Sequence, residues 1–141
     1  MNNNKKLGTL GEDIACRYLE KKGYKIIKRN YVKNLSGAEK GEIDIIAKQK
    51  TKVSDFFLGN KNSIIFIEVK TASAEDFRFS DFLPEDKVDF RKKKQLKKIA
   101  QIWLMENKIP LDFPWQIDVI SVKIDLSRKK AKIRHFKNVV F

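Results

Sequence analysis

Cysteine and histidine are nearly absent from this sequence, which has one of each in 141 residues. A single thiol allows no internal disulfide, and it excludes zinc sites built from several cysteines. Cys16 lies among apolar neighbours in a predicted helix, where a thiol is more often a small buried side chain than a nucleophile. The lone histidine, His135, lies near a predicted C-terminal strand and is expected to be structural rather than catalytic.

Long apolar runs are also missing. No segment approaches the roughly 18 consecutive apolar residues of a membrane span, and the opening residues, MNNNKKLGTLGED, lack the apolar region of a secretion signal. The sequence has neither an internal repeat nor a linker rich in Pro, Gly or Ser. We therefore expect one domain over residues 1–141, cytoplasmic and soluble, with no membrane partner.

Positive charge is what the sequence has in excess. Lysine and arginine number 31 against 18 aspartates and glutamates, which gives a formal net charge of +13. This surplus favours an anionic partner, most commonly nucleic acid. An anionic membrane surface would also attract it, and a lysine-rich protein that is merely soluble would look the same by charge alone. Hydrophobic residues make up 42% of the chain, enough for a packed core.

The hydrophobic pattern predicts elements in the order α-β-β-β-α-β-β. One helix is predicted over residues 9–23, with Thr9 as N-cap and Gly23 as the stop, and another over residues 87–107. Strands are predicted over residues 24–32, 42–48, 64–70, 115–124 and 130–141. Residues 49–63 are too many for a tight hairpin and predict an extended loop. This order indicates an α/β domain with a mixed central sheet flanked by helices.

The third predicted strand, IIFIEVK, is apolar on both faces and yet ends in charged residues. Because side chains alternate across a strand, Glu68 and Lys70 share one face with Phe66. A carboxylate and an ammonium at the end of an internal strand are costly unless they are paired, hydrated at a sheet edge or bound to a metal. Glu68 therefore either forms a buried ion pair with Lys70 or another lysine, or serves as a metal ligand.

The preceding predicted strand repeats this pattern, because Asp44 is flanked by isoleucines. Strict alternation places Ile43 and Ile45 on one face, and Asp44 with Ile46 on the other. If the two strands are antiparallel neighbours, Asp44 and Glu68 approach each other, and a divalent cation would relieve their repulsion. Oxygen ligands without histidine favour a hard cation, Mg²⁺ or alternatively Mn²⁺.

Glu12 is a third acidic candidate, at the edge of the apolar stripe of the first predicted helix. From there it could reach over the sheet. The spacing Thr9-x-x-Glu12 is also that of a capping box, in which the glutamate returns to the Thr9 amide. Spacing alone favours the cap.

The motif GEID (residues 41–44) followed by FIEVK (residues 66–70) resembles the PD-(D/E)xK nuclease signature, an Asp on one strand and Glu-x-Lys on the next. With LGEDIACRYLEKKGYKIIKRN before it, and RKKKQLKKIAQIWL, IDVISV and IRHFKNVVF after it, nearly the whole chain resembles the YraN-like family of predicted endonucleases. That family is distantly similar to archaeal Holliday-junction resolvases. The resemblance implies a restriction-endonuclease-like fold, metal binding by Asp44 and Glu68, and a Lys70 that orients or activates the attacking water. It also implies that Glu12 completes the acidic cluster.

The second predicted helix carries a run of basic residues, most of which should lie on a solvated face: Lys87, Arg91, Lys92, Lys93, Lys94, Lys97 and Lys98. Lys92 differs, because it is in phase with Leu96 and Ile99 and should lean toward the sheet. It either contacts a phosphate near the metal or merely covers apolar surface with its stem while its ammonium stays in water.

Arg29 ends the first predicted strand near the GEID loop, where it touches phosphate or, more in keeping with its position, holds the loop. Asp118 alternates with apolar residues in the fourth predicted strand, where a salt bridge to the lysine-rich helix is favoured over a supporting role beside the acids. The candidate nucleic-acid contacts are thus Lys92, Arg91, Lys93 and Arg29.

Together these features predict a Mg²⁺-dependent endonuclease that hydrolyses phosphodiester bonds in DNA, including branched or repair intermediates. A cation held by carboxylates neutralises the phosphodiester and lowers the pKa of its bound water, and a nearby lysine adds fixed positive charge. The alternative is a nucleic-acid-binding module that keeps the fold without turnover. Resolvase-like proteins of this fold often act as dimers on two-fold symmetric junctions, so a homodimer is compatible with this interpretation.

Overall fold

The computed structural model describes residues 3–37, 39–49, 62–73 and 90–139. The described elements follow the predicted order, and their bounds are α1 (Asn3–Lys21), β1 (Tyr24–Asn34), β2 (Lys40–Gln49), β3 (Ser63–Ser73), α4 (Phe90–Glu106), β4 (Trp115–Asp125) and β5 (Lys130–Phe136). The predicted α/β class with the order α-β-β-β-α-β-β is confirmed.

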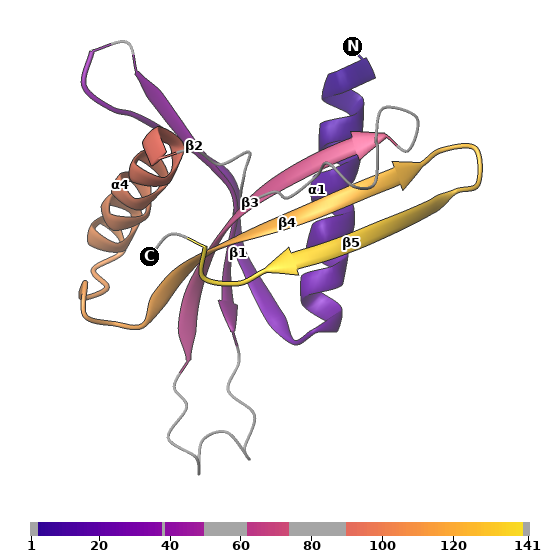
Figure 1. Cartoon of the computed structure of the whole chain (residues 1–141). Helices are drawn as coiled ribbons and strands as arrows, with labels where there is room; N and C mark the ends of the chain where they lie inside the picture. Colours follow the sequence, from indigo (N-terminus) through magenta and orange to yellow (C-terminus); the bar gives the residue numbers. More distant parts are fainter. Residues whose placement is uncertain (1–2, 38, 50–61, 74–89, 140–141) are drawn as a thin grey trace.

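The strands form one five-stranded sheet in the order β1-β2-β3-β4-β5 (Figure 1). Neighbouring strands are antiparallel except β3 and β4, which are parallel. Parallel neighbours need a long crossover connection, and α4 lies in the segment that joins these two strands. The sheet is therefore mixed, as predicted, and the architecture is consistent with a restriction-endonuclease-like fold.

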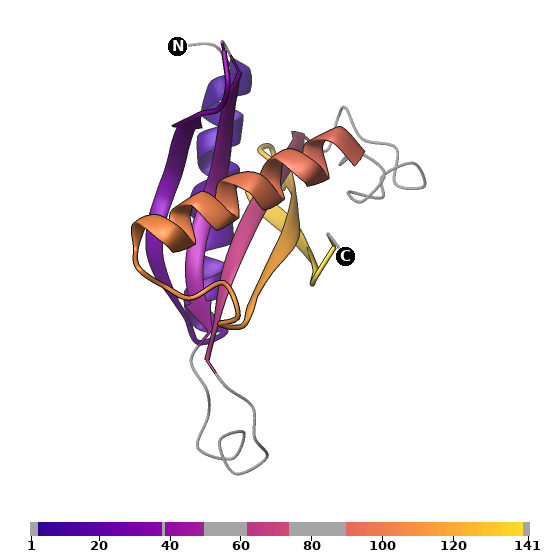
Figure 2. The same cartoon turned by 90° about the vertical axis from the view of Figure 1, so that its left-hand side faces the viewer.

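The two helices cover opposite faces of the sheet (Figure 2). On one face α1 packs through Ala15 and Leu19. On the other face α4 packs through Leu96, Ile99 and Trp103. Each helix thus buries one apolar stripe against strand side chains, and the sheet lies between two separate hydrophobic clusters.

β3 is an internal strand that is buried on both faces, as its apolar run predicts. Ile64 and Phe66 pack in the cluster on the α4 side, and Ile65 and Ile67 pack in the cluster on the α1 side. Fully burying one such side chain contributes ~1.5–3 kcal/mol to folding. The strand that carries Glu68 and Lys70 is therefore held firmly along its first half.

α1 begins earlier than predicted. Thr9 lies inside the helix, where its Oγ1 donates a hydrogen bond to the Lys5 carbonyl oxygen at 3.0 Å. The prediction of Thr9 as N-cap, and of a capping box with Glu12, is therefore wrong. Leu7 packs against the cluster on the α1 side, so the additional turn adds apolar contact. The predicted stop is confirmed, because Gly23 has a φ of 93° and its amide donates to the Glu20 carbonyl at 3.0 Å.

Two predicted segments fall partly outside the described residues. The predicted helix over residues 87–107 is described from Phe90 to Glu106. Of the predicted loop at residues 49–63, residues 50–61 lie outside the described part, while Gln49 pairs with Ser63 where β2 and β3 begin their ladder. Within the described ranges, no helix combines the length and the apolar character needed to cross a membrane.

Candidate active site

The candidate site lies where β2 separates from β3. Their antiparallel ladder runs from Gln49 paired with Ser63 to Ile45 paired with Ile67, and Asp44 follows directly after the last pair. Asp44 Oδ2 accepts a hydrogen bond from the Val69 backbone amide at 2.8 Å. A side-chain oxygen thus satisfies a β3 amide beyond the point where the ladder of main-chain pairs ends.

β2 is irregular at this point, and the prediction of strict alternation is wrong here. Ile43 and Ile46 both pack on the α4 side, whereas Ile45 packs on the α1 side. The β1–β2 register pairs residues 29 and 31 with residues 45 and 43, and Asn30 between them has a φ of 52°. Asp44 lies at this irregularity and accepts the Val69 amide of β3.

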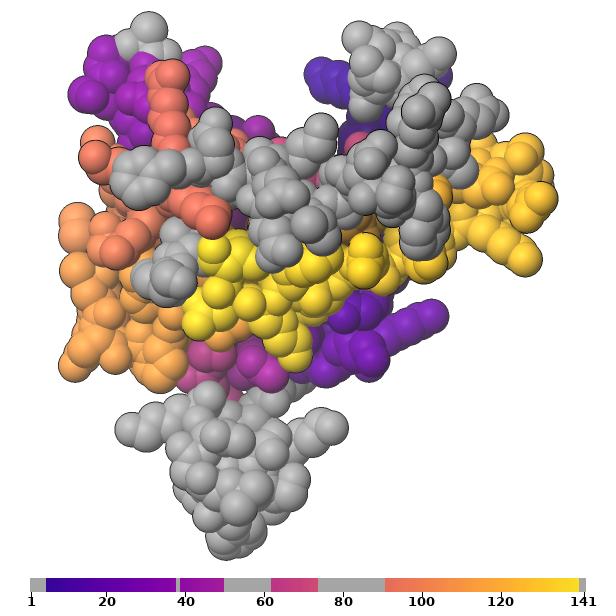
Figure 3. Space-filling view, viewed as in Figure 1, coloured from indigo at the N-terminus to yellow at the C-terminus, as the bar shows by residue number. Residues whose placement is uncertain are grey.

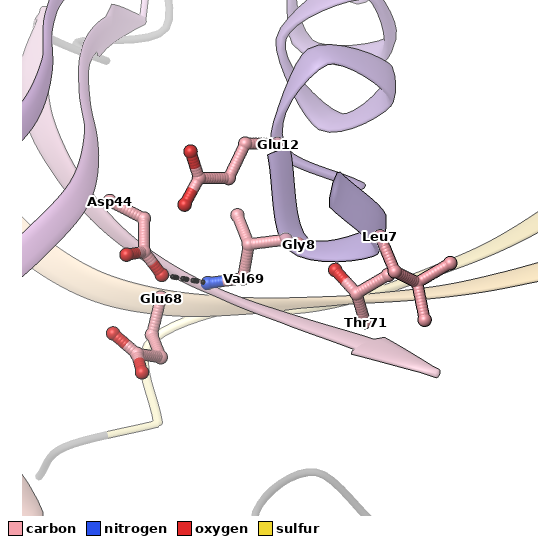
Figure 4. Close-up of a pocket in the computed structure, with 7 residues that line it drawn as sticks. All are labelled: Leu7, Gly8, Glu12, Asp44, Glu68, Val69 and Thr71. Carbon is pink, nitrogen blue, oxygen red and sulfur yellow. Dashed lines mark hydrogen bonds between the residues drawn. The ribbon is translucent and has the colours of Figure 1, made fainter. Parts of the chain in front are cut away.

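A pocket of about 290 Å³ opens beside Asp44, on the side where α1 crosses β3. Its lining residues are Leu7, Gly8, Glu12, Asp44, Glu68, Val69 and Thr71 (Figure 4). The close-up shows the three carboxyl groups one after another, Glu12 from α1, Asp44 from β2 and Glu68 from β3. The three acids that the family resemblance implies as a cluster therefore all line this pocket.

Burial and neighbouring acids raise the pKa of Asp44. Burial is the largest cause that raises the pKa of Asp44, the nearby Glu68 carboxylate also raises it, and the Val69 amide opposes the shift; together these effects place the pKa at about 8. Near neutral pH the metal-free protein therefore holds Asp44 largely protonated. The ionised group would need a positive charge close by, which is the situation in which a carboxylate binds a cation.

Glu68 lies on the other side of β3 from α1 and is only 7% exposed. Its Oε1 atom is 3.3 Å from Lys70 Nζ and 3.8 Å from Lys92 Nζ. Both alternatives for Glu68 thus have structural support, because it pairs with lysines and also lines the acidic pocket. Lys92 leans toward the sheet, as its helical phase predicts.

Glu12 is held over the pocket from α1. Burial is the main cause that raises the pKa of Glu12, and Arg29, whose Nη2 is 3.7 Å from Glu12 Oε2, lowers it. The side-chain amide of Asn30 is oriented with its nitrogen toward the two glutamates. In this orientation the nitrogen donates to Glu12 Oε2 and to Glu42 Oε1, each at 3.2 Å. β1 therefore positions the carboxylate that α1 supplies.

Arg29 belongs to this acidic network. Its Nη2 lies 2.8 Å from Asp13 Oδ1, and its Nε is buried with no hydrogen-bond partner among the described residues. These contacts agree with the structural alternative that the sequence left open for Arg29. The other candidate nucleic-acid contacts, Arg91 and Lys93, lie with Lys92 in the first turns of α4, where Arg91 is exposed and Lys93 is half-buried.

The acids do not form a closed cage. Among the residues that the structure describes, no group of three or more His, Cys, Asp or Glu side chains is arranged to hold a metal ion. Asp44 and Glu68 remain as two oxygen donors on adjoining strands, with Glu12 further along the same pocket (Figure 4). Two carboxylates suit Mg²⁺, which keeps several water molecules and is commonly held through one or two acidic side chains.

A second polar cluster lies away from the pocket and corrects the prediction for Asp118. Asp118 is fully buried, and its Oδ2 is 2.7 Å from His135 Nε2, while Tyr18 OH is 3.1 Å from His135 Nδ1. Asp118 Oδ1 accepts from Gln116 Nε2 at 2.8 Å and from the Asn138 amide at 2.9 Å. The prediction of a salt bridge from Asp118 to the lysine-rich helix is therefore wrong, because α4 covers the other face of the sheet. His135 has the structural place predicted for it.

Sequence reasoning missed the apolar wall of the pocket, formed by Leu7, Gly8 and Val69 with Thr71 beside it. One signal was present, because Gly8 precedes Glu12 by four residues and so lies on the same side of a helix. With Thr9 interpreted as the N-cap, that signal was lost, since Leu7 and Gly8 then preceded the helix.

Comparisons with known proteins cover most of the chain. The sequence model described as "Uncharacterised protein family UPF0102" matches residues 11–122. The chain is 35% identical over 135 residues to a UPF0102 protein of Alkaliphilus oremlandii, a match that covers 96% of this chain and 97% of the relative. It is also 35% identical over 137 residues to a UPF0102 protein of Caldanaerobacter subterraneus subsp. tengcongensis, with 96% and 95% covered. A Clostridium botulinum UPF0102 protein is 35% identical over 135 residues, with 96% and 94% covered. The chain therefore belongs to the UPF0102 family, and the YraN-like resemblance is confirmed.

Proposed function

We propose that this protein is a metal-dependent endonuclease of the PD-(D/E)xK type that hydrolyses phosphodiester bonds in DNA. The observation that carries the proposal is the meeting of Asp44 and Glu68 at one pocket, with Lys70 Nζ 3.3 Å from Glu68 Oε1. These residues come from adjoining strands, and Asp44 lies where the strands part. An aspartate on one strand and Glu-x-Lys on the next is the arrangement that the nuclease signature describes.

The donor set fits a hard divalent cation. Asp44 and Glu68 would hold Mg²⁺ or Mn²⁺, with Glu12 as a further oxygen donor along the pocket. When bound, such a cation supplies charge that neutralises a phosphodiester and lowers the pKa of a water molecule. The raised pKa of Asp44 supports this assignment, because its ionised form lacks enough positive charge nearby.

The chain's own groups then have distinct parts. The Val69 amide fixes Asp44 through Oδ2, and Asp44 lines the pocket in that position. The Lys70 ammonium lies beside Glu68, where it can orient the attacking water or stabilise negative charge that develops on the phosphate. Lys92 lies near the same carboxylate and adds a second positive charge from α4.

Nucleic acid is the substrate class that the overall charge favours. The net charge of +13 and the basic first half of α4 provide attraction for a polyanion, with Arg91 and Lys93 as candidate phosphate contacts. We propose DNA, with branched DNA among the candidates, on which a homodimer would match the two-fold symmetry of a junction.

The test is cleavage of labelled branched, single-stranded and duplex DNA in Mg²⁺, Mn²⁺ or EDTA. Wild type is compared with Asp44→Ala, Glu68→Ala and Lys70→Ala, and with Glu20→Ala as a matched control, because Glu20 is an exposed acid on α1. We expect metal-dependent cutting that falls by about a hundredfold or more in the three site variants. The control should cut like wild type.

Circular dichroism and DNA binding in EDTA establish that each variant is folded and still meets its substrate. Tight binding without cutting on any substrate, unchanged by metal or by the site variants, would replace the nuclease with a nucleic-acid-binding module. Cutting that continues in EDTA would contradict the metal requirement.

A further inference from the structure

Helix α1 contains two glycines, Gly8 and Gly11, and packing against the sheet explains only Gly11. A Cβ at Gly11 would lie 2.0 Å from Thr71 Oγ1 and 2.8 Å from Thr71 Cβ, so only glycine fits where the helix crosses β3. A Cβ at Gly8 would have no atom of the described residues within 4 Å. Both glycines lie within the helix and neither has a positive φ. Gly8 therefore has no steric or conformational reason to be glycine.

Glycine at this place weakens the helix relative to alanine, because it has the larger backbone entropy to lose. The empty space in front of Gly8 belongs to the acidic pocket, of which Gly8 is a lining residue (Figure 4). Gly8 precedes Glu12 by one helical turn, so a side chain at position 8 would extend over the same side of α1 as that carboxylate. What glycine provides here is clearance beside the acids.

The wall at Gly8 differs chemically from the rest of the pocket. Leu7 and Val69 are apolar, Thr71 offers a hydroxyl, and the seven lining residues include no basic side chain. The two lysines beside the site, Lys70 and Lys92, instead contact Glu68. An anionic phosphate is therefore better placed at the Glu68 end, and a neutral group is better placed against the wall of Leu7 and Gly8.

We propose that Gly8 is a specificity-determining residue whose missing side chain admits the sugar of the nucleotide next to the cleaved phosphate. The inference rests on the proposed nuclease function and deepens it, since it assigns the sugar-phosphate backbone an entry between α1 and the C-terminal half of β3. In the nucleic-acid backbone each phosphate is bonded to a sugar, which is neutral. A phosphate held near Asp44 and Glu68 therefore places a sugar next to the site. The N-terminal end of α1 and the outer part of the β1–β2 hairpin stand apart in the view of Figures 1 and 3.

The test changes the size of residue 8 and, separately, the size of the substrate. Gly8→Ala and Gly8→Leu are compared with wild type and with Thr9→Leu, a matched control at an exposed neighbouring position. The readouts are the thermal midpoint, Mn²⁺ binding in the absence of DNA, and kcat/KM for DNA cleavage. The DNA is either unmodified or carries a three-carbon spacer in place of the nucleotide on one or the other side of the mapped cut.

We expect both Gly8 variants to fold with a midpoint no lower than that of wild type and to bind Mn²⁺ equally well. Cleavage of unmodified DNA should fall about tenfold in Gly8→Ala, since one added methyl group in a fitted pocket costs on that order, and by about a hundredfold in Gly8→Leu. The spacer on one side of the cut, which removes the sugar, should restore most of the loss in Gly8→Leu. Thr9→Leu should cut like wild type.

Gly8→Leu that cuts unmodified DNA as well as wild type would overturn the inference and leave the nuclease intact. A cleavage defect that neither spacer relieves would also overturn it, because the added side chain would then act on something other than the sugar. No cleavage by wild type on any substrate would overturn the proposed function itself, and this inference with it.

Discussion

Under the proposed function, Asp44 has two roles that need different protonation states. As a protonated carboxyl it is tolerated between β2 and β3 while Oδ2 accepts the Val69 amide. As a carboxylate it would, under the proposed function, be a ligand for a cation. Its raised pKa, about 8, makes the metal-free protein favour the first state and makes cation binding release a proton.

The stability of the metal-free protein should therefore fall as the pH rises. The unfolded chain has the ordinary aspartate pKa of 3.8, and the folded protein has a pKa of about 8, so the folded state binds more protons between these values. The contribution of Asp44 to the free energy of unfolding is fully present below pH 3.8, and it is lost as the pH rises toward 8. Urea unfolding in EDTA between pH 5 and pH 8 measures this, and Asp44→Asn should show a flatter profile. Parallel profiles for the two proteins would contradict the assignment.

Lys92 offers a second test at the scale of one side chain. Its Nζ is 3.8 Å from Glu68 Oε1, whereas Lys94, two residues along α4, is exposed. Under the proposed function, Lys92→Ala should lower kcat/KM for DNA cleavage by about tenfold to a hundredfold, because a fixed positive charge beside the phosphate is lost. Lys94→Ala removes the same charge from the solvated face and should change kcat/KM by less than about threefold. Equal effects of the two changes would assign Lys92 only a general electrostatic role.

At the scale of elements, the site depends on how closely α1 approaches β3. The Cβ that alanine would add at Gly11 meets Thr71 at distances that real contacts do not show. Gly11→Ala should therefore destabilise the protein by ~1–3 kcal/mol, the usual cost of overpacking. Gly8→Ala adds the same atom in the same helix where space is open and serves as the control. Chemical denaturation of both variants measures the difference, and equal stability of the two would show that α1 can move away from the sheet without cost.

The elements and their faces could be predicted where the pattern is regular. The apolar run of residues 64–67 predicts an internal strand, and it is one, because each face of β3 meets its own helix. Asp44 and Glu68 could be predicted as neighbours, since antiparallel pairing of two adjacent strands brings them together. The irregularity at Asp44 could not be predicted, because alternation assumes a regular ladder, whereas Ile43 and Ile46 share one side of the sheet and Ile45 packs on the other.

Other features depend on contacts that one-dimensional spacing does not contain. Thr9-x-x-Glu12 matches a capping box, but α1 gains a further turn whose Leu7 contacts the sheet. Asp118 bonds His135 of β5 and the backbone amide of Asn138 after β5, and His135 in turn bonds Tyr18 of α1, so only the tertiary fold identifies these contacts. The pocket wall at Gly8 likewise exists only once α1 crosses β3.

At the scale of the whole molecule, the Asp118 cluster joins the C-terminal part of the chain to the sheet. Asp118→Ala would leave His135 Nε2, the Gln116 amide and the Asn138 amide without their buried acceptor. Each such loss costs ~1–3 kcal/mol, so we expect a total of at least ~3 kcal/mol in urea unfolding. Asp125→Ala, in the same strand but partly exposed, should cost less than ~1 kcal/mol. A small effect of Asp118→Ala would mean that water replaces the lost acceptor.

The net charge of +13 predicts the salt dependence of DNA binding for the molecule as a whole. If the protein contacts six phosphates, raising the salt concentration from 50 mM to 200 mM should lower its affinity for DNA by about a thousandfold. Fluorescence anisotropy with an unlabelled competitor, in EDTA to prevent cutting, measures the slope of affinity against salt. A nearly flat slope would remove phosphate contacts as the basis of binding.

The parallel pairing of β3 with β4 has a consequence for the order in which the protein is made. Glu12, Asp44 and Glu68 all precede residue 69, whereas β4, the second neighbour of β3, begins at Trp115. During synthesis the three acidic residues are therefore incorporated well before β4, the second neighbour of β3 in the sheet. Until β4 has been made, the strand that carries Glu68 lacks one of its two neighbours in the sheet. The sheet beside the candidate site is therefore complete only after residues 115–125 have been synthesised.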